Sequence, residues 1–247
     1  NVSLRLLKTN YLIILRESTE GLFSSYGGGG VVNDACAYDT QIITRKGTER
    51  AARYCFDLAL GRNGRPADGK KLVTCTHKGN VFRSFAYMTK IFNEVAEEYK
   101  GSVDSELCMI DALTLLMTQR PENYDIILAE NMHGDIISDM AAAYVGGMGM
   151  APSGDIGYEH GLFQPSHGSA PTIAGKGLAN PTGTILSAKM MLAWLGRRYD
   201  DAALTQAAQL IDDAVYQTFL EGVRTSDVAG SASTSMFGDT VVKHLMK

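Results

Sequence analysis

The stretch of residues 125–147, "DIILAENMHGDIISDMAAAYVGG", decides the fold that the sequence predicts. Its first five residues form a short apolar run that is typical of a buried strand, and residues 130–147 continue as a helical pattern. A strand that leads into a helix is the repeating unit of layered α/β proteins. Two acidic residues, Asp135 and Asp139, stand four positions apart within that helix.

These two carboxylates raise a question of charge, because residues four apart lie on the same helix face and like charges there repel. An isolated pair of this kind usually belongs to a solvated stripe opposite an apolar one. Here the helix contains no Lys or Arg and few other polar residues, and Asp is seldom buried without a partner. We therefore expect a divalent cation, Mg²⁺ or Mn²⁺, because these ions prefer carboxylate and water oxygens.

The same alternation of strand and helix patterns runs along the chain and favours an α/β layered fold. Strands are predicted at 11–15, 37–44, 72–76, 106–110 and 125–129. Helices are predicted at 47–60, 81–99, 111–119, 182–198, 202–221 and 235–246. The glycine-rich residues 146–181 are predicted to be loop, either close to a ligand or a flexible linker, and the four glycines at 27–30 to be a loop tip.

The composition is that of an ordinary globular protein with one large or two medium domains. The chain has 247 residues, of which 45% are hydrophobic and 20% are charged. Its 23 basic and 27 acidic residues give a net charge of −4, and it has no Lys/Arg run. This balance argues against nucleic acid as a partner, although a local basic cluster could still bind a small anion.

The cysteines and the hydropathy pattern bear on the compartment. Cys36, Cys55, Cys75 and Cys108 form no Cys-x-x-Cys pair, which argues against a zinc site and predicts buried thiols in the reducing cytoplasm. No apolar run approaches the roughly 18 residues of a membrane span. No basic-then-apolar leader opens the chain either, so we expect neither a membrane span nor a signal peptide.

Four charged residues are candidates for chemistry. Arg5 and Arg16 can each clamp a carboxylate with two parallel hydrogen bonds, although a single Arg is more often part of a surface ion pair. Lys78 directly follows a predicted strand, where side chains point toward the usual ligand crevice and a lysine can act as a base. Asp111 lies at a strand-to-helix junction, where a helix cap and a functional role are equally good interpretations.

A second candidate site is the loop "HGSAPTIAGKGLANP" at residues 167–181. Its small residues expose backbone N–H groups that, with Ser169, can approach a phosphate closely. His167, Ile173 and Asn180 could contact a base or a ribose. The loop matches neither the Gly-x-Gly-x-x-Gly fingerprint nor a Walker loop, so its residues indicate an anion-binding loop without naming the anion.

Four segments resemble the β-decarboxylating dehydrogenases, the family of isocitrate, 3-isopropylmalate, homoisocitrate, tartrate and D-malate dehydrogenases. They are "RESTEGLF", "HKGNVF", "ENMHGDIISDMAAAYVGGMGMAPSGDIG" and "FQPSHGSAPTIAGKGLANPTGTILSAKMML", and they extend over nearly the whole chain. The resemblance implies an NAD(P)-dependent, Mg²⁺- or Mn²⁺-requiring oxidation of a 2-hydroxy acid that carries a carboxylate on C3, followed by loss of CO₂. It also implies a homodimer whose active sites are shared between subunits.

The fold implied by this resemblance is the isopropylmalate dehydrogenase-like α/β fold, layered α/β/α, with two subdomains around a mixed sheet. Residues 1–145 would form the small, dimerising domain, which carries the catalytic lysine and the metal-binding aspartates. Residues 146–247 would form the C-terminal half of the large cofactor-binding domain, and the N-terminal part of that domain has no counterpart in this sequence.

The resemblance also implies roles for individual residues. The metal ligands are Asp135, Asp139 and Asp111, and both Asp111 and the catalytic Lys78 reach the site from the second subunit. Arg5 and Arg16 match the substrate-carboxylate clamps, and Asn80 matches a residue on the nicotinamide side of the cofactor. The adenosine-binding loop supplies the remaining cofactor contacts: His167, Gly168, Ser169, Ala170, Pro171, Ile173 and Asn180.

Two departures from the family pattern refine these expectations. Phe23 occupies the position of the family's catalytic tyrosine. Thr172 and Ile173 replace the Lys-Tyr pair of bacterial-type NADP enzymes, which favours NAD. We expect activity closest to 3-isopropylmalate dehydrogenase, with tartrate/D-malate or (homo)isocitrate dehydrogenase as alternatives. A non-catalytic regulatory subunit is an alternative of another class, disfavoured because the three aspartates and the lysine are present.

Overall fold

A computed structural model describes residues 12–246 of the chain. Arg5 lies outside these described residues. The described chain divides into two compact units, one of residues 12–141 and one of residues 142–246. The division falls within helix α6 (Asn131–Val145), between Ala141 and Ala142.

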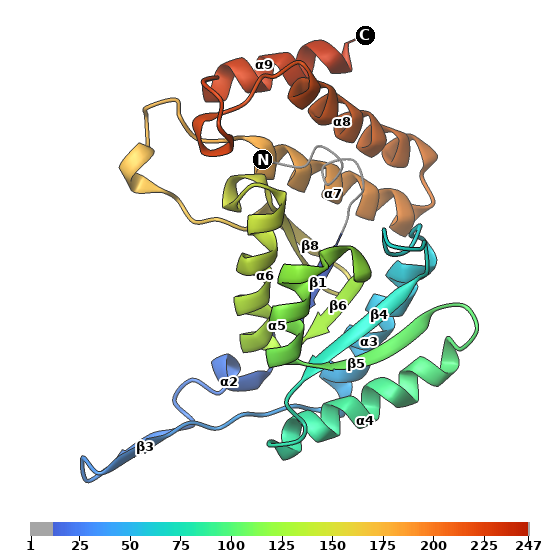
Figure 1. The fold of residues 1–247 in the computed structure, drawn as a ribbon, viewed down its shortest axis with the longest axis vertical. Helices are drawn as coiled ribbons and strands as arrows, with labels where there is room; N and C mark the ends of the chain where they lie inside the picture. Colours follow the sequence, from blue (N-terminus) through green and yellow to red (C-terminus); the bar gives the residue numbers. More distant parts are fainter. Residues whose placement is uncertain (1–11, 247) are drawn as a thin grey trace. The chain divides into compact units, whose positions relative to one another are not determined.

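The first unit consists of a parallel sheet, its crossover helices and one hairpin (Figure 1). The sheet strands are β1 (Ile13–Arg16), β4 (Leu72–His77), β5 (Asp104–Met109) and β6 (Ile126–Ala129). The helices are α2 (Gly21–Ser24), α3 (Arg45–Leu60), α4 (Arg83–Glu98), α5 (Ile110–Gln119) and the first part of α6. A short 3₁₀ turn at Pro121–Asn123 follows α5, as Pro121 predicted.

The strand order is β1-β6-β4-β5, and all three pairings are parallel. Ile126 of β6 lies between Ile13 of β1 and Val73 of β4, while Leu72 pairs with Asp104 of β5. The mixed sheet that we expected is not what residues 12–246 form, because the four-stranded sheet is parallel and antiparallel strands pair only in two separate two-stranded sheets. The reason is local, since helical crossovers join the strands and return the chain to the same end of the sheet.

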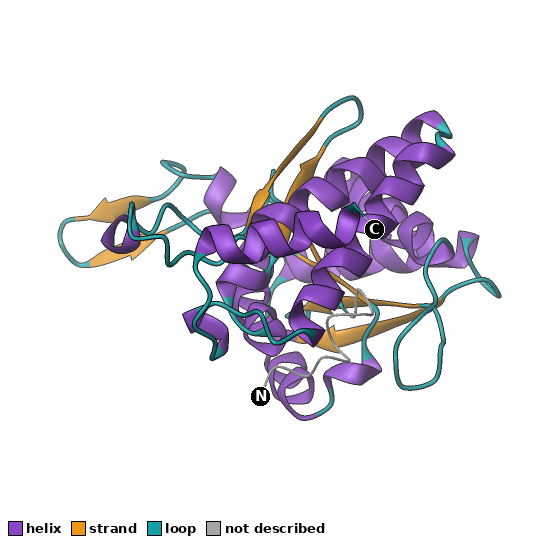
Figure 2. Ribbon diagram, turned by 90° about the horizontal axis from the view of Figure 1, so that it is seen from above, coloured by secondary structure: helices purple, strands orange, loops and turns teal. Residues whose placement is uncertain are grey.

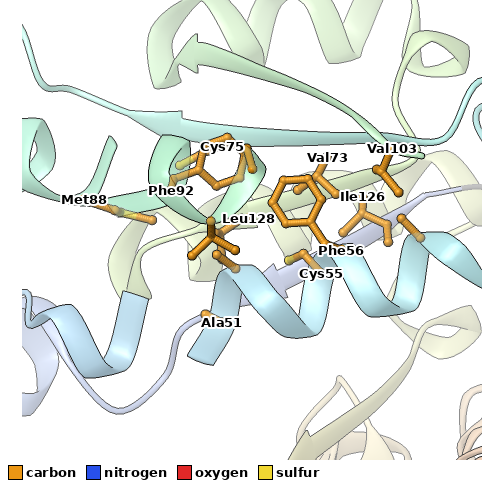
Figure 3. Close-up of a cluster of buried hydrophobic side chains, with 14 of the residues drawn as sticks. Ala51, Cys55, Phe56, Val73, Cys75, Met88, Phe92, Val103, Ile126 and Leu128 are labelled. Atoms are coloured by element: carbon orange, nitrogen blue, oxygen red, sulfur yellow. The ribbon is translucent and has the colours of Figure 1, made fainter. Parts of the chain in front are cut away.

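Helices cover both faces of this sheet, which agrees with the expected α/β/α layering. Successive strand residues point to opposite faces. Val73, Ile126 and Leu128 therefore share one face, where they pack against α3 and α4 around Phe56 (Figure 3). The opposite face of β4 and β5 is contacted by α5, which lies across the sheet from α3 and α4 in Figure 1.

The second unit holds an antiparallel hairpin and three long helices. The hairpin strands are β7 (Pro152–Ile156) and β8 (Gly161–Pro165), and the helices are α7 (Thr182–Tyr199), α8 (Ala202–Leu220) and α9 (Thr234–Leu245). Its core includes Met150, Phe219 and Phe237, all almost completely buried. Residues 146–181, which the sequence predicted to be rich in loop, also contain this hairpin, in which Pro152–Ile156 pairs with Gly161–Pro165 over a glycine-containing turn.

The predicted strand at 37–44 was wrong in extent. Gly27, Gly28 and Gly29 lie in the loop after α2, as expected, whereas Gly30 begins a strand. The chain forms a hairpin of β2 (Gly30–Val32) and β3 (Cys36–Tyr38), whose turn residues Asn33 and Asp34 have φ values of 47° and 57°. Asn and Asp tolerate this left-handed conformation, which two-residue hairpin turns require. Figure 2 shows this hairpin as a short ribbon that stands away from the sheet of its own unit. Thr44 instead caps α3, because its hydroxyl accepts the Gly47 N–H at 3.1 Å.

The cysteines correct a further expectation. Cys55 and Cys75 are buried thiols, as predicted, and burial raises the pKa of both. Cys36 is exposed on the β2–β3 hairpin and Cys108 is only half-buried, because each lies on a strand with an uncovered face. Among residues 12–246, no helix is both long enough and apolar enough to span a membrane.

Candidate functional site

The carboxyl edge of the parallel sheet gathers most of the predicted catalytic residues. β1 ends at Arg16, and β4 ends just before Lys78. Asp111 follows the end of β5 by two residues, and β6 leads directly into the helix of Asp135. In parallel sheets this edge is where ligands bind, because loops between neighbouring strands and helices open there. The topology therefore aligns side chains that are up to 119 residues apart in sequence.

Arg16 is held by three contacts within its unit. Its Nε donates to Asn131 Oδ1 at 2.8 Å, and its Nη1 donates to Asp135 Oδ1. Its guanidinium lies over the Phe23 ring, 5.6 Å from the ring centroid. Its Nη2 makes no hydrogen bond with any residue of 12–246, so one side of the planar fork remains available to an anion.

Gly134 allows α6 to approach Arg16 closely. A Cβ at this position would lie only 2.7 Å from Cβ and Cγ of Arg16. The backbone of Gly134 also closes the first turn of α6, because its N–H donates to the Glu130 carbonyl at 2.7 Å. A residue with any side chain would therefore push Arg16 away from α6.

Gly134→Ala is expected to lower the free energy of unfolding by about 1–3 kcal/mol, the usual cost of forcing a methyl group into a packed site. The matched control is Gly238→Ala in α9, where an added Cβ meets nothing within 4 Å. There the helical alanine should raise stability by about 0.5–1 kcal/mol. Urea unfolding of both variants measures the difference. If both substitutions change the free energy of unfolding by the same amount, then Arg16 moves aside for the added methyl group without loss of stability.

Lys78 and Asp111 form a second cluster on β4 and β5. The Lys78 ammonium lies 2.5 Å from Asp111 Oδ1, and this hydrogen bond holds the pKa of the Asp111 carboxyl below its usual range. Two imidazoles are near this ammonium. Burial, and then the charge of Lys78, lower the pKa values of His77 and His133 from the ordinary histidine range. This direction favours the neutral form of both rings, which adds no positive charge beside Lys78.

Asp135 and Asp139 are both exposed on α6, which corrects the expectation that this helix has little solvated face for them. Ile136 beside them is 57% exposed, so this face of α6 is uncovered within the described chain. Asp139 makes no ion pair with any residue of 12–246. Two carboxylates on one helix face, one of them unpaired, fit the oxygen-donor preference of Mg²⁺ or Mn²⁺.

A complete metal site does not form within one copy of the described chain. No group of three or more His, Cys, Asp or Glu side chains in residues 12–246 is arranged to hold a metal ion. Asp111 belongs to the Lys78 cluster, whereas Asp135 pairs with Arg16. The carboxylates of the predicted ligand set are thus present but divided into two clusters.

Phe23 lies on α2, with its ring 46% exposed. It is placed beside the Arg16 guanidinium and carries no group that could give or take a proton. Tyr26 follows it closely in the chain and is 97% exposed, so its hydroxyl faces solvent. Asn80 is also exposed, in the turn after β4.

The predicted cofactor loop lies in the second unit. Gly168, Ser169, Ala170 and Pro171 are exposed, while His167 and Ile173 are half-buried. Ala170 has a φ of 45°, a left-handed conformation that is rare for a residue with a side chain. Ser169 and its neighbours can thus present backbone N–H groups to a ligand, which fits a phosphate-bearing cofactor.

Asn180 differs from the rest of that loop because its side chain is buried. Its Nδ2 donates to Asp227 Oδ2 at 3.0 Å, and its Oδ1 accepts the Thr182 N–H at 3.0 Å. Asp227 also accepts from the Thr225 hydroxyl at 2.5 Å. The Asn180 side chain therefore joins the end of the loop to the start of α7 and to the 3₁₀ turn Ser226–Val228.

The family model for isocitrate/isopropylmalate dehydrogenase matches residues 3–241 of the chain. This protein belongs to that family. It is 42% identical over 234 residues to 3-isopropylmalate/3-methylmalate dehydrogenase of Methanocaldococcus jannaschii, covering 94% of this chain and 67% of the relative. It is 38% identical to a regulatory subunit of NAD-isocitrate dehydrogenase of Dictyostelium discoideum, covering 96% of this chain and 65% of the relative.

Solved structures of the family share this fold. Isocitrate dehydrogenase from Methylococcus capsulatus superimposes with a TM-score of 0.81 at 33% identity, covering 95% of this chain and 67% of that one. The chain thus spans about two thirds of the length of these relatives.

Sequence reasoning missed several residues of the site in this dehydrogenase-family chain. Asn131 and Gly134 fix Arg16 against α6, and Glu17 pairs with Arg50 of α3 at 2.5 Å. The signal for Asn131 was its place just after a predicted strand, where ligand-facing residues gather. Gly134 and Glu17 gave no comparable signal, because their importance depends on which distant side chains they touch.

Proposed function

We propose that this protein is an NAD-dependent, divalent-metal-dependent dehydrogenase that oxidatively decarboxylates a 2-hydroxy acid bearing a carboxylate on C3. The observation that carries the proposal is the carboxyl edge of the sheet, where an arginine, an aspartate-bearing helix and a lysine–aspartate pair are aligned. Membership of the isocitrate/isopropylmalate dehydrogenase family supports the same chemistry. The substrate most favoured is one like 3-isopropylmalate, the acid in the name of a 42%-identical relative.

In this proposal the chain's own residues bind the acid and move its proton. Arg16 binds a substrate carboxylate through the Nη2 that no described residue occupies. Lys78 takes the proton of the C2 hydroxyl as its neutral amine, and Asp111, 2.5 Å away, pairs with the ammonium that results. A divalent ion held by Asp111, Asp135 and Asp139 would polarise the C2 oxygen when bound, while NAD would accept the hydride.

A homodimer is part of the proposal, because the Arg16 and Lys78 clusters are separate within one chain. In the dimer, Lys78 and Asp111 of one subunit would complete the site that contains Arg16, Asp135 and Asp139 of the other. Strand β5 is an edge of the sheet with exposed Leu107 and Met109. An uncovered edge with large apolar side chains favours pairing with another chain.

The experiment that tests the function is a substrate screen with the complete gene product. NADH formation with Mn²⁺ would be followed for 3-isopropylmalate, D-malate, tartrate, isocitrate and homoisocitrate. We expect the highest kcat/KM for 3-isopropylmalate and no NADH after removal of Mn²⁺ by a chelator. A higher kcat/KM for D-malate, tartrate or an isocitrate than for 3-isopropylmalate would change the proposed substrate but not the proposed reaction.

A regulatory subunit is the second candidate, since one relative bears that name. The retained Lys78, Asp111, Asp135 and Asp139 favour catalysis, because a subunit without chemistry has no need of a complete ligand set. Absence of NADH formation with every acid, together with activation of another family subunit on mixing, would support the regulatory role.

NAD is expected to be preferred to NADP by at least about tenfold in kcat/KM, the effect of roughly 1.4 kcal/mol of repulsion. Neither Thr172 nor Ile173 carries a positive charge that could pair with a 2′-phosphate, and the exposed Asp227 is fixed beside the end of the loop by Asn180. The measurement is kcat/KM for both cofactors in the wild type and in Asp227→Asn. This substitution should lower the preference for NAD, measured as the ratio of kcat/KM with NAD to that with NADP. Equal values in the wild type would indicate that Arg224 receives the phosphate.

A further inference from the structure

Asn131, the first residue of α6, connects three segments of the first unit. Its side chain is 2% exposed. Its Nδ2 donates to the carbonyl oxygens of Ser18 at 3.1 Å and Glu20 at 2.8 Å, while its Oδ1 accepts from Arg16 Nε at 2.8 Å. One buried amide thus binds both the arginine and the turn that follows it.

Only a carboxamide satisfies all three partners at this position. The carbonyl oxygens of Ser18 and Glu20 each accept a hydrogen bond here, and the Arg16 N–H requires an acceptor. An aspartate would keep the acceptor but place a second oxygen against the two carbonyls. A leucine of similar shape would leave all three groups without a partner, and unsatisfied buried polar groups are costly.

The other side of the same turn is fixed independently. The Glu17 carboxylate accepts the backbone N–H groups of Thr19 at 3.0 Å and Glu20 at 2.8 Å, and it pairs with Arg50 of α3. Residues 16–20 are therefore anchored to α3 by Glu17 and to α6 by Asn131. Of these two anchors, only Asn131 touches the Arg16 guanidinium directly.

We propose that Asn131 is a positioning residue that fixes the Arg16 guanidinium against the helix that carries Asp135 and Asp139. The substrate clamp and the metal-ligand helix then behave as one rigid body, and a carboxylate bound by Arg16 keeps a constant position relative to those aspartates. The role of Arg16 and of the aspartates rests on the proposed function. The contact itself does not, so it can be tested without substrate.

The first experiment measures hydrogen exchange at Arg16 Nε by ¹⁵N NMR of the complete protein, with the signal assigned from its absence in Arg16→Lys. Asn131→Leu should speed exchange by about tenfold or more, the expected loss for a hydrogen bond to a charged group. Asn131→Asp keeps an oxygen that can accept the Arg16 Nε–H, so exchange at Nε should remain as slow as in the wild type. The control is Thr74→Val, which removes another partly buried hydrogen bond, from Thr74 Oγ1 to Glu106 at 2.8 Å, on the side of β6 away from Arg16 in the strand order.

The second experiment measures kinetics with the acid that is turned over best. Asn131→Leu should raise KM for the acid about tenfold while KM for NAD stays unchanged, and the effect should vanish in an Arg16→Met background because the two residues act together. Unchanged Arg16 exchange in both Asn131 variants would overturn the positioning role. Faster exchange with unchanged KM for the acid would support the positioning contact and would overturn the clamp role given to Arg16 under the proposed function.

Discussion

Lys78→Met is expected to lower turnover by about 10²- to 10⁴-fold, the contribution typical of a positioned proton-transfer group. Asp135→Asn is expected to abolish most turnover because the divalent ion loses one of its carboxylate ligands. Mixed in equal amounts, the two inactive variants should recover about a quarter of the wild-type activity through two-fold heterodimers. The reason is the division of the site into two clusters. Half of the dimers would be mixed, and each mixed dimer would hold one site with an intact Lys78 and an intact Asp135.

The matched control for this mixture uses two variants from the same cluster. Arg16→Met and Asp135→Asn both alter the half of the site on β1 and α6. Every site in their mixed dimer retains one defect, so no activity should return. Sedimentation of differently tagged subunits confirms that mixed dimers form. Mixed dimers without recovery in the Lys78 mixture would show that each site is built within a single chain.

Phe23→Tyr is the second substitution with a large expected effect. The tyrosine of related dehydrogenases gives a proton to the carbon from which CO₂ has departed, and Phe23 has none to give. We expect the introduced phenol to raise steady-state turnover by up to about 10²-fold, the lower end of the range for a positioned general acid. Hydride transfer depends on Lys78 and on cofactor placement, so it should be unaffected.

The structure supports this position for the new phenol. The Phe23 ring is half exposed, and it lies 5.6 Å from the Arg16 guanidinium that is proposed to bind substrate. A hydroxyl on that ring would need no repacking, because the ring is not enclosed. Tyr26 and a water relayed through Lys78 are the two other proton sources within the chain's reach.

Rapid mixing of enzyme, NAD, Mn²⁺ and substrate distinguishes these sources. The wild type should show a pre-steady-state burst of NADH followed by slow turnover, and Phe23→Tyr should leave the burst unchanged while speeding the later phase. Tyr26→Phe in the wild-type background serves as the control for the alternative phenol. If the wild type shows no burst and Phe23→Tyr is no faster, then Phe23 is a packing residue.

The sequence by itself determined the alternation of strands and helices in the first unit and the three long helices of the second. Hydrophobic period and length placed Leu72–His77, Ile126–Ala129 and the long helices within about two residues, because burial of one face imposes those patterns. Family motifs also identified Arg16, Lys78, Asp111 and Asp135 as site candidates. Residues at strand ends are recognisable from sequence because the apolar run before them stops abruptly.

Only the tertiary structure decided which of those residues meet. Strand order put β6 between β1 and β4, so Asp135 pairs with Arg16 while Asp111 pairs with Lys78. Lys78 and Asp111 are more than thirty residues apart in the sequence, and Arg16 and Asp135 are more than a hundred apart. No local propensity encodes such a contact. It arises from the crossover topology and from close approaches such as that of Gly134 to Arg16, which exist only once the sheet and its helices have packed.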